Sequence, residues 1–458
     1  MLQGTYLNRR GARLGPSLAS FLITFLMFGT VSGQVVAEWI ASYEQSGTAA
    51  LVLDPDGNVF VTGSRRTPQG PSMIQFLTIK YDPSGRVEWV ATHDPRPGYN
   101  EGAHLITRDS QGDLYVAGTS CRSNACDYKM LKYDKQGKLQ WSAIYDGPAR
   151  GYDVVKALAL DPDGNPCLAG ASEGIGTGLD YATIKYDKQD GSELWVARFH
   201  GRIDGDGATA LAVDSTGNIY VTGHGDQLCN PRCADGNYVT VKYDPYGNEQ
   251  WVARYGPRSG AHIPRAIVVD PEGNVYITGT SEGFTTLSDY ATVKYDANGR
   301  EVWATRYSGW TRGINSATAL ALDPDGNVCV TGWSLRRELT YDFDYVTLQY
   351  DQAGNELWMA RYDGSGNGWD EPGSIVVDAD RNVYVAGYSE GAGTRYDFAT
   401  VKYDRYGQEQ WVARYDGPSS GHDSAKAIAV DPQKNVYVTG ASTGKAFSES
   451  ITLKYRQK

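Results

Sequence analysis

Six aromatic side chains in the second half of the chain offer the most direct means of binding a ligand. They are Trp310, Trp333, Tyr341, Trp369, Tyr388 and Tyr396. Exposed aromatic rings can stack on sugar rings or anchor a protein partner. The sequence therefore predicts a glycan-binding or protein-binding surface in this region. The alternative is that the loops fold these rings inward as a small local core, because aromatic side chains bury readily.

The six cysteines fall into two close pairs and two isolated residues. Cys121 and Cys126 are five positions apart, Cys229 and Cys233 are four apart, and each pair is predicted to form a disulfide within its own loop. Zinc binding is the alternative, but neither segment brings four Cys or His ligands together. The other two, Cys167 and Cys329, replace Tyr or Phe in related segments and are predicted to be buried free thiols, too far apart to bridge.

Metal and cofactor chemistry has no recognisable motif in this chain. The six histidines, scattered without metal-type spacing, are His93, His104, His200, His224, His262 and His422. The Asp-Pro-Asp-Gly-Asn segments at Asp54, Asp161 and Asp323 lack the distal Glu of an EF-hand calcium loop, so they are interpreted as turns. No metal site and no cofactor is predicted.

A repeat organises these residues. An apolar segment that ends in glycine, as in VFVTG, occurs eight times, beginning at Val59, Leu114, Pro166, Ile219, Val275, Val328, Val383 and Val436. A tryptophan series follows the same period of 50 to 56 residues, at Trp39, Trp89, Trp141, Trp195, Trp251, Trp303, Trp358 and Trp411. Periods of this length are typical of propellers and solenoids.

Each period divides into four short strands with turn residues between them. In one copy the apolar segments ALAV, IYVTG, YVTVKYD and WVARY follow one another between residues 210 and 255. Pro and Gly in the Asp-Pro-Asp-Gly-Asn segments suit a tight turn, since Pro presets φ and Gly accepts a positive φ. Strands of this length, separated by such turns, predict a meander of antiparallel β-strands.

The ends of the chain predict a closed ring rather than an open solenoid. The repeats span 48–455, the segment 38–43 (EWIASY) resembles a lone fourth strand, and the chain ends after a third strand, ITLKY. The two ends would complete one blade between them, which removes exposed sheet edges. We therefore expect an all-β fold: a single eight-bladed β-propeller over 34–458, with four antiparallel strands per blade, closed by the N-terminal strand completing the C-terminal blade.

The repeat resembles the bacterial SBBP family of β-propeller repeats, found in secreted and cell-surface proteins. The resemblance is carried by A-x-D-P-x-G-N-V-Y-V-T-G, D-Y-A-T-V-K-Y-D and E-x-W-V-A-R-Y, and it covers all eight copies. It implies a propeller and no catalytic residues. The spacing of Asp187, Gly191 and Trp195 is more weakly similar to the docking motif of quinoprotein propellers, and that tryptophan is expected to pack between neighbouring blades.

Strand direction assigns the loops to two faces. The turns between first and second strands and between third and fourth strands share one face, and the longer, variable connections share the other. The variable face is the candidate binding face, and the aromatic group belongs to it. At the mouth of the channel, a ring of polar residues is predicted five positions before the Leu or Ile of each first strand: Ser46, Asn100, Asp153, Asp206, His262, Asn315, Asp370 and Asp423. Asp and Asn commonly cap turns, so this ring is interpreted as structural.

The N-terminus predicts a secreted protein. Arg9, Arg10 and Arg13 precede an apolar stretch over 18–31 and small residues at 31–33, which indicates a signal peptide over 1–33. An uncleaved anchor is the alternative. The mature chain is expected to be a monomer outside the cell, in the periplasm or on the cell surface, with no membrane span. The net charge of −11 and the absence of a basic segment argue against a nucleic-acid partner.

These observations favour a non-catalytic binding or scaffold module whose partner is a glycan or a protein. The first alternative is a propeller enzyme acting on polysaccharide, a hydrolase or lyase, whose carboxylates would come from different blades without leaving a linear motif. The second is a structural protein of the cell surface. No catalytic residue is assigned, because the chain shows no nucleophile–base pair and no Gly-rich phosphate motif.

Overall fold

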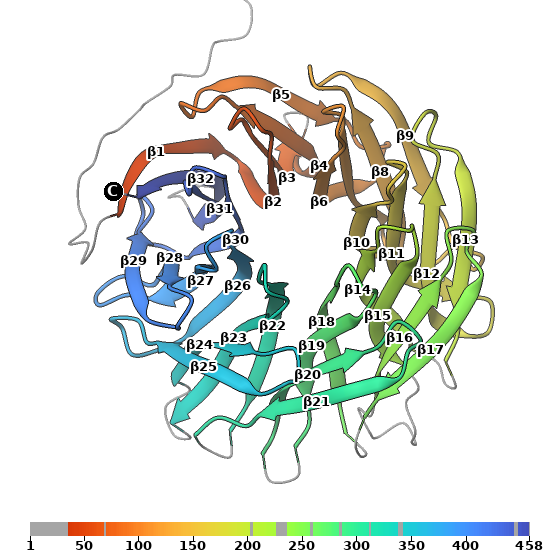
Figure 1. Cartoon of the computed structure of the whole chain (residues 1–458). Coiled ribbons are helices and arrows are strands. Elements are labelled where there is room, and N and C mark those ends of the chain that lie inside the picture. Colours follow the sequence, from red (N-terminus) through yellow and green to blue (C-terminus); the bar gives the residue numbers. More distant parts are fainter. Residues whose placement is uncertain are drawn as a thin grey trace, which may run out of the picture. The chain divides into compact units, whose positions relative to one another are not determined.

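The computed structural model describes residues 35–67, 70–201, 205–225, 236–256, 260–283, 286–310, 313–337, 342–443 and 448–457, with side chains except at 70–72 and 337. All regular structure in these ranges is β-strand, and the strands form eight four-stranded antiparallel sheets arranged as a ring (Figure 1). The prediction of an eight-bladed propeller is confirmed. The signal peptide predicted over 1–33 lies outside the described residues.

The first and second strands of each blade lie toward the centre of the ring (Figure 1). The first strands, in blade order, are β2 (Ser46–Leu53), β6 (Asn100–Arg108), β10 (Asp153–Leu160), β14 (Gly207–Val213), β18 (His262–Val269), β22 (Asn315–Leu322), β26 (Asp370–Val377) and β30 (Asp423–Val430). The second strands are β3 (Val59–Thr67), β7 (Leu114–Arg122), β11 (Pro166–Gly174), β15 (Ile219–Gly225), β19 (Val275–Ser281), β23 (Val328–Arg337), β27 (Val383–Glu390) and β31 (Val436–Thr443).

The third and fourth strands complete each blade outward. The third strands are β4 (Gly70–Tyr81), β8 (Ala125–Tyr133), β12 (Gly178–Tyr186), β16 (Asn237–Tyr243), β20 (Asp289–Tyr295), β24 (Asp342–Tyr350), β28 (Tyr396–Tyr403) and β32 (Ser448–Gln457). The fourth strands are β5 (Val87–His93), β9 (Leu139–Tyr145), β13 (Glu193–Phe199), β17 (Glu249–Tyr255), β21 (Glu301–Tyr307), β25 (Glu356–Tyr362), β29 (Glu409–Tyr415) and, for blade 8, β1 (Val35–Glu44).

Strand β1 closes the ring. It pairs antiparallel with β32 from Val35 opposite Gln457 to Glu44 opposite Glu449, and blade 8 has the order β1-β32-β31-β30. The predicted closing strand over 38–43 lies inside β1, which is longer at both ends. The two ends of the sequence thus share one sheet, so β32 is an interior strand rather than an exposed edge.

The repeated tryptophan joins neighbouring blades, as predicted. In blade 4 the ring of Trp251 lies 5.9 Å from that of Tyr220 in its own blade and 6.4 Å from that of Tyr295 in blade 5. Its Nε1 donates a hydrogen bond to the carbonyl oxygen of Ala297 (3.1 Å), in the next blade's turn. Gly299 follows in that turn with φ +79°, and a Cβ there would lie 2.6 Å from the indole, so glycine makes room for the ring.

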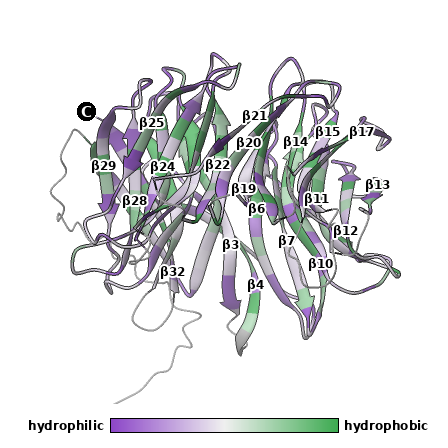
Figure 2. Cartoon of the chain, turned by 90° about the horizontal axis from the view of Figure 1, so that it is seen from below, coloured by the Kyte–Doolittle hydropathy of each residue, from purple (hydrophilic) through white to green (hydrophobic). Residues whose placement is uncertain are grey.

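The short turns use their aspartates internally. Asp323 Oδ1 accepts hydrogen bonds from the amides of Asp325 and Asn327, and its Oδ2 accepts one from Asn327 Nδ2. Gly326 takes φ +80° in the same turn. These hydrogen bonds and the positive φ of the glycine support the interpretation of the Asp-Pro-Asp-Gly-Asn segments as turns. In Figure 2 hydrophobic residues lie mainly along the strands, whereas the loops are largely hydrophilic.

The cysteines behave as their spacing predicts where the structure describes them. Cys121 and Cys126 form a disulfide, and Cys167 and Cys329 are buried free thiols. Cys229 and Cys233 lie outside the described residues. A search of the described part of the chain for a helix long and apolar enough to span a membrane finds none.

Candidate functional site

The predicted channel ring is buried inside the blades rather than open to the channel. One polar residue per blade occupies this position, near the start of the first strand or, for Asp206, directly before it. These residues are Ser46, Glu101, Asp153, Asp206, His262, Asn315, Asp370 and Asp423, all at most 4% exposed. Blade 2 differs from the prediction. Glu101, not Asn100, lies opposite the repeated serine, Ser120, while Asn100 is exposed and accepts a hydrogen bond from the Ile74 amide.

These buried side chains hold the variable loops through backbone amides. Asp153 accepts hydrogen bonds from the amides of Gly147 (2.8 Å) and Glu173 (3.1 Å). Asp370 accepts the equivalent bonds from Gly364 (2.6 Å) and Glu390 (3.0 Å). This is the bonding expected of a turn-capping role. Such carboxylates are occupied and buried, so they are poorly placed to meet a ligand on the axis.

Hydrogen-bonded polar side chains extend across the blade from the buried ring residue to the fourth strand. We call them the polar layer. In blade 3, Arg198 donates hydrogen bonds to Asp180 Oδ2 (2.7 Å), to Ser172 Oγ (2.6 Å) and to the hydroxyl of Tyr145 in blade 2 (2.9 Å). Asp153 lies opposite Ser172 in the same sheet. Arg306, Arg361 and Arg414 make the corresponding contacts in blades 5, 6 and 7. The arginine of the W-V-A-R-Y segment is therefore a structural ion-pair partner, which the sequence analysis did not identify.

Burial raises the pKa of several ring carboxyls. For Asp370 the pKa rises to about 6, because burial outweighs the hydrogen bonds from Gly364, Ser389 and Glu390. Burial also raises the pKa of Asp153 and Asp423. The folded state thus binds a proton at Asp370 more tightly than the unfolded chain, whose Asp pKa is about 3.9.

Asp370→Asn is expected to reduce the pH dependence of stability. Because the pKa of Asp370 is higher in the folded state, its contribution favours folding at low pH and is lost as pH rises from about 4 through 6. The full difference in the free energy of unfolding is about 3 kcal/mol, of which about 2 kcal/mol falls between pH 4.5 and pH 7. Asn315 occupies the same place in blade 6, so the substitution is compatible with the fold. Urea denaturation of the wild type and of Asp370→Asn at several pH values between 4.5 and 7 measures the change in stability. If stability depended on pH equally in the two proteins, the raised pKa of Asp370 would be contradicted.

The structure places five of the six predicted aromatic residues; Tyr341 lies outside the described residues. Trp310 is 65% exposed and Trp369 is 38% exposed. Trp333, Tyr388 and Tyr396 are half-buried. The loops therefore bury these rings only in part. Trp310 and Trp369 are the two most exposed of the five.

Blades 6 and 7 each contain a triad of ring side chains at equivalent positions. In blade 6, Phe343 lies 5.0 Å from Trp333 and 5.1 Å from Trp369, between ring centroids. In blade 7, Tyr396 lies 5.1 Å from Tyr388 and 4.9 Å from His422. The outermost members, Trp369 and His422, each form a parallel bridge to the central residue of their triad.

The two triads are specific to these blades. The same three positions hold Ala171, Leu179 and Gly205 in blade 3, and Thr280, Ser288 and Ile314 in blade 5. The repeat itself does not require aromatic rings there. Sequence analysis identified five of the described members or neighbours of this group, but it did not assign His422 to it.

Trp310 lies in the connection before β22, the first strand of blade 6, and its ring contacts a cation. The guanidinium of Arg361 lies 4.4 Å from the centroid of the Trp310 ring. The same Arg361 forms an ion pair with Asp344 (2.6 Å). The polar layer of blade 6 thereby fixes one face of this exposed indole. We call Trp310 and the two triads the aromatic face.

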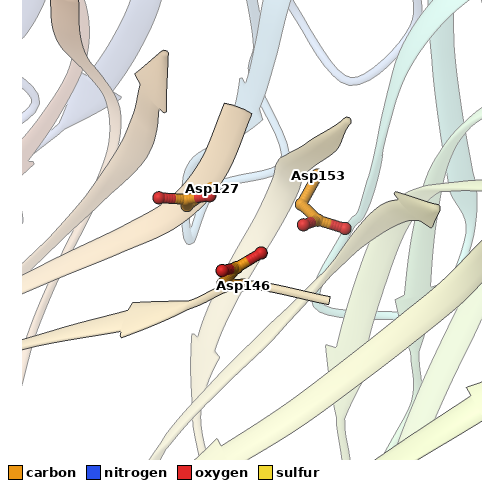
Figure 3. A group of neighbouring side chains, drawn as sticks. All are labelled: Asp127, Asp146 and Asp153. Atoms are coloured by element: carbon orange, nitrogen blue, oxygen red, sulfur yellow. The ribbon is translucent and has the colours of Figure 1, made fainter. Parts of the chain in front are cut away.

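Carboxylates also gather near the variable loops. One oxygen from each of Asp127, Asp146 and Asp153 lies within 4.8 Å of the others, and Figure 3 shows these side chains approaching one another from neighbouring segments. The described residues contain two further groups of this kind: Asp342 with Asp344 and Asp363, and Asp397 with Asp416 and Asp423. Each group combines a third strand with the connection that follows the fourth strand, and two groups add the first residue of the next blade, Asp153 or Asp423.

Comparison with known proteins supports the fold and its repeat. Residues 250–284 match the SBBP family, described as a beta-propeller repeat. The chain is 22% identical over 497 aligned positions to an uncharacterized WD repeat-containing protein, L264, of Acanthamoeba polyphaga mimivirus, covering 92% of this chain and 31% of that protein. The chain thus spans less than a third of this relative's length. That relative is viral, so a bacterial origin has no support here.

One solved structure shares the architecture, and a second gives a weaker superposition. Quinohemoprotein alcohol dehydrogenase from Comamonas testosteroni superposes with a TM-score of 0.54 at 13% identity, covering 92% of this chain and 76% of that one. The polysaccharide lyase Uly1 gives a TM-score of 0.47 at 10% identity, covering 77% and 89%. The TM-score of 0.54 indicates a common fold. Sequence identities this low do not indicate a common function. Fold and repeat together define an eight-bladed β-propeller that contains an SBBP-type repeat.

Proposed function

We propose that the chain is a secreted, monomeric, non-catalytic binding module that holds a glycan on the aromatic face of blades 6 and 7. The observation that carries the proposal is the pair of exposed indoles, Trp310 and Trp369, together with ring triads that, among the described residues, are complete in blades 6 and 7 only. Flat indole surfaces suit sugar rings, and nearby carboxylates can accept hydrogen bonds from hydroxyl groups. A protein ligand is the alternative occupant of the same face.

The enzymatic alternative has less support from the described carboxylates. A glycosidase needs a carboxylic acid and a carboxylate that reach the substrate. The described aspartate with the most strongly raised pKa, Asp370, is 0% exposed and accepts two backbone hydrogen bonds. It is engaged in holding the loop between blades 6 and 7, so a role in loop structure accounts for its properties.

Replacing Trp310 and Trp369 together by alanine is expected to weaken glycan binding at least tenfold, since buried aromatic anchors at binding surfaces contribute about 2 kcal/mol or more each. A glycan array identifies the ligand, and calorimetry compares the variants. Tyr406→Ala is the matched control, because Tyr406 is 63% exposed in a short turn on the opposite face. Both variants should keep the wild-type circular dichroism spectrum.

Each outcome selects among the candidate functions. Unchanged affinity of the double variant would remove the aromatic face as the binding site. Product release from a bound polysaccharide would favour the enzyme. Binding of a defined protein, lost with both tryptophans, would favour the protein ligand, and the absence of any ligand would favour a structural role. The mass and cell fraction of the mature chain test secretion.

A further inference from the structure

Blade 6 carries one more carboxylate in its polar layer than the repeat requires. Asp344 and Asp363 occupy positions that are also Asp in blade 7, where they are Asp397 and Asp416. Asp342 is additional. Its position holds Ala125, Gly178, Leu287 and Arg395 in blades 2, 3, 5 and 7. One oxygen of each of Asp342, Asp344 and Asp363 lies within 4.8 Å of the others, whereas the groups of three in blades 2 and 7 take their third carboxylate from the first strand of the next blade.

Two arginines, Arg336 and Arg361, each form an ion pair with one carboxylate oxygen of this group. Arg361 Nη1 donates to Asp344 Oδ2 (2.6 Å), and Arg336 Nη1 pairs with Asp363 Oδ2. The Oδ1 atoms of Asp342, Asp344 and Asp363 are buried and have no hydrogen-bond donor. Asp342 is 2% exposed, and no hydrogen bond to either of its carboxylate oxygens occurs among the described residues.

Such a carboxylate is costly to bury. A buried ionised group without a partner loses its hydration and gains nothing in return. Among the described side chains, the three carboxylates and the two guanidiniums of Arg336 and Arg361 sum to one net negative charge. The unsatisfied oxygens, which belong to strand β24 and to the connection after β25, need either a cation or a shared proton.

We propose that Asp342, Asp344 and Asp363 bind a calcium ion. Calcium takes six to eight oxygen ligands in flexible geometry, and water can complete the shell beyond three carboxylates. An all-oxygen donor set does not suit zinc, which prefers Cys and His. The arginines contact Oδ2 of Asp344 and of Asp363, which leaves their Oδ1 atoms free to bind the ion. The site does not depend on the proposed glycan function, although Phe343, between Asp342 and Asp344, belongs to the first aromatic triad.

The other two carboxylate groups differ in what their members already bind. In the group of Figure 3, Asp153 accepts amides through both oxygens, and Asp127 pairs with Arg96 (2.5 Å). In blade 7, Asp423 Oδ2 accepts the Gly417 amide (2.5 Å) and Asp416 accepts a hydrogen bond from Ser420, so that only Oδ1 of Asp397 and of Asp423 are buried without a donor. Blade 6 is where three carboxylates from the same sheet and its following loop keep buried oxygens free of donors.

The experiment titrates the full-length protein, stripped with EDTA, with calcium chloride to about 10 mM, which spans the range of extracellular calcium modules. Calorimetry and the thermal midpoint are the readouts. The wild type should bind calcium and unfold at a higher temperature with it. Asp342→Asn should lose at least tenfold in affinity and lose the calcium-dependent shift, while its midpoint in EDTA stays equal to or above that of wild type, because an unpaired buried anion has been removed.

Terbium provides a second readout that reports position. Tb³⁺ replaces Ca²⁺, and its luminescence is sensitised by nearby tryptophan; the Trp333 and Trp369 rings contact Phe343 beside the site. Sensitised emission should appear in wild type and in the matched control Asp416→Asn, and fall in Asp342→Asn. Equal calcium affinity in wild type and Asp342→Asn, or no calcium binding by wild type, would overturn the proposal and favour a shared proton.

Discussion

A disulfide between positions 44 and 449 is expected to stabilise the propeller by several kcal/mol, through Glu44→Cys and Glu449→Cys together. These residues are the last partners in the ladder between β1 and β32. The bond would close a loop of roughly 400 residues, for which the loss of unfolded-state entropy corresponds to at most about 6 kcal/mol.

Local electrostatics adds to this effect. Two glutamates face each other across the strand pair, and like charges directly opposite are destabilising. Burial raises the pKa of Glu449, and the charge of Glu44 raises it further. Each single cysteine variant relieves the repulsion without closing the ring, so the single variants are the controls for the double. Urea denaturation of the oxidised proteins measures the difference. A double variant no more stable than the better single one would show that closure through β1 contributes little.

The sequence predicted the fold because the repeat encodes it locally. Each turn aspartate, each strand glycine and each tryptophan acts within one blade or on its neighbour, so eight copies imply eight blades. Closure followed from the frame of the repeat, since a lone fourth strand at one end and a missing one at the other can only pair with each other. The disulfide at Cys121 and the buried thiols followed from spacing and from replaced aromatic residues.

The site was less predictable because it depends on register and on contacts between segments. Counting from Leu105 selected Asn100 for the ring, but the strand register places Leu105 opposite Ala117, where blade 3 has Ala157 opposite Ala169. The apolar pattern of blade 2 is displaced by one residue, and Glu101 takes the buried position. Counting back from the turn aspartate, Asp109, would have found it.

The carboxylate group of blade 6 was even harder to predict from the sequence. Asp342 and Asp344 lie on β24, whereas Asp363 follows β25, and no motif of metal-type spacing connects them. Their meeting depends on how the third strand lies beside the connection to the next blade. The aromatic residues were recognisable by type, but their arrangement as two equivalent triads required the parallel bridges from Phe343 to Trp369 and from Tyr396 to His422.

Each apolar repeat segment ends in glycine because a larger residue would clash with the neighbouring strand. Gly63, the last residue of VFVTG, lies opposite Thr48, where β2 shifts register against β3. A Cβ at Gly63 would lie 1.9 Å from the carbonyl oxygen of Gly47 and 2.8 Å from Thr48 Cα. Equivalent approaches of about 2 Å occur at Gly118, Gly170, Gly223, Gly279, Gly332, Gly387 and Gly440. The irregularity in the first strand thus brings its backbone against the second strand in every blade.

Gly63→Ala is therefore expected to destabilise the protein by about 3 kcal/mol or more, because one methyl group would force two paired strands apart in a closely packed blade. Gly47→Ala is the matched control in the same sheet: its Cβ would meet Ala441 Cβ at 3.5 Å, an ordinary contact, and losing a strand glycine favours folding by about 0.5–1 kcal/mol. Urea denaturation of both variants measures the contrast. If Gly63→Ala were as stable as Gly47→Ala, the close approach of the two strands would not be what requires glycine in the repeat.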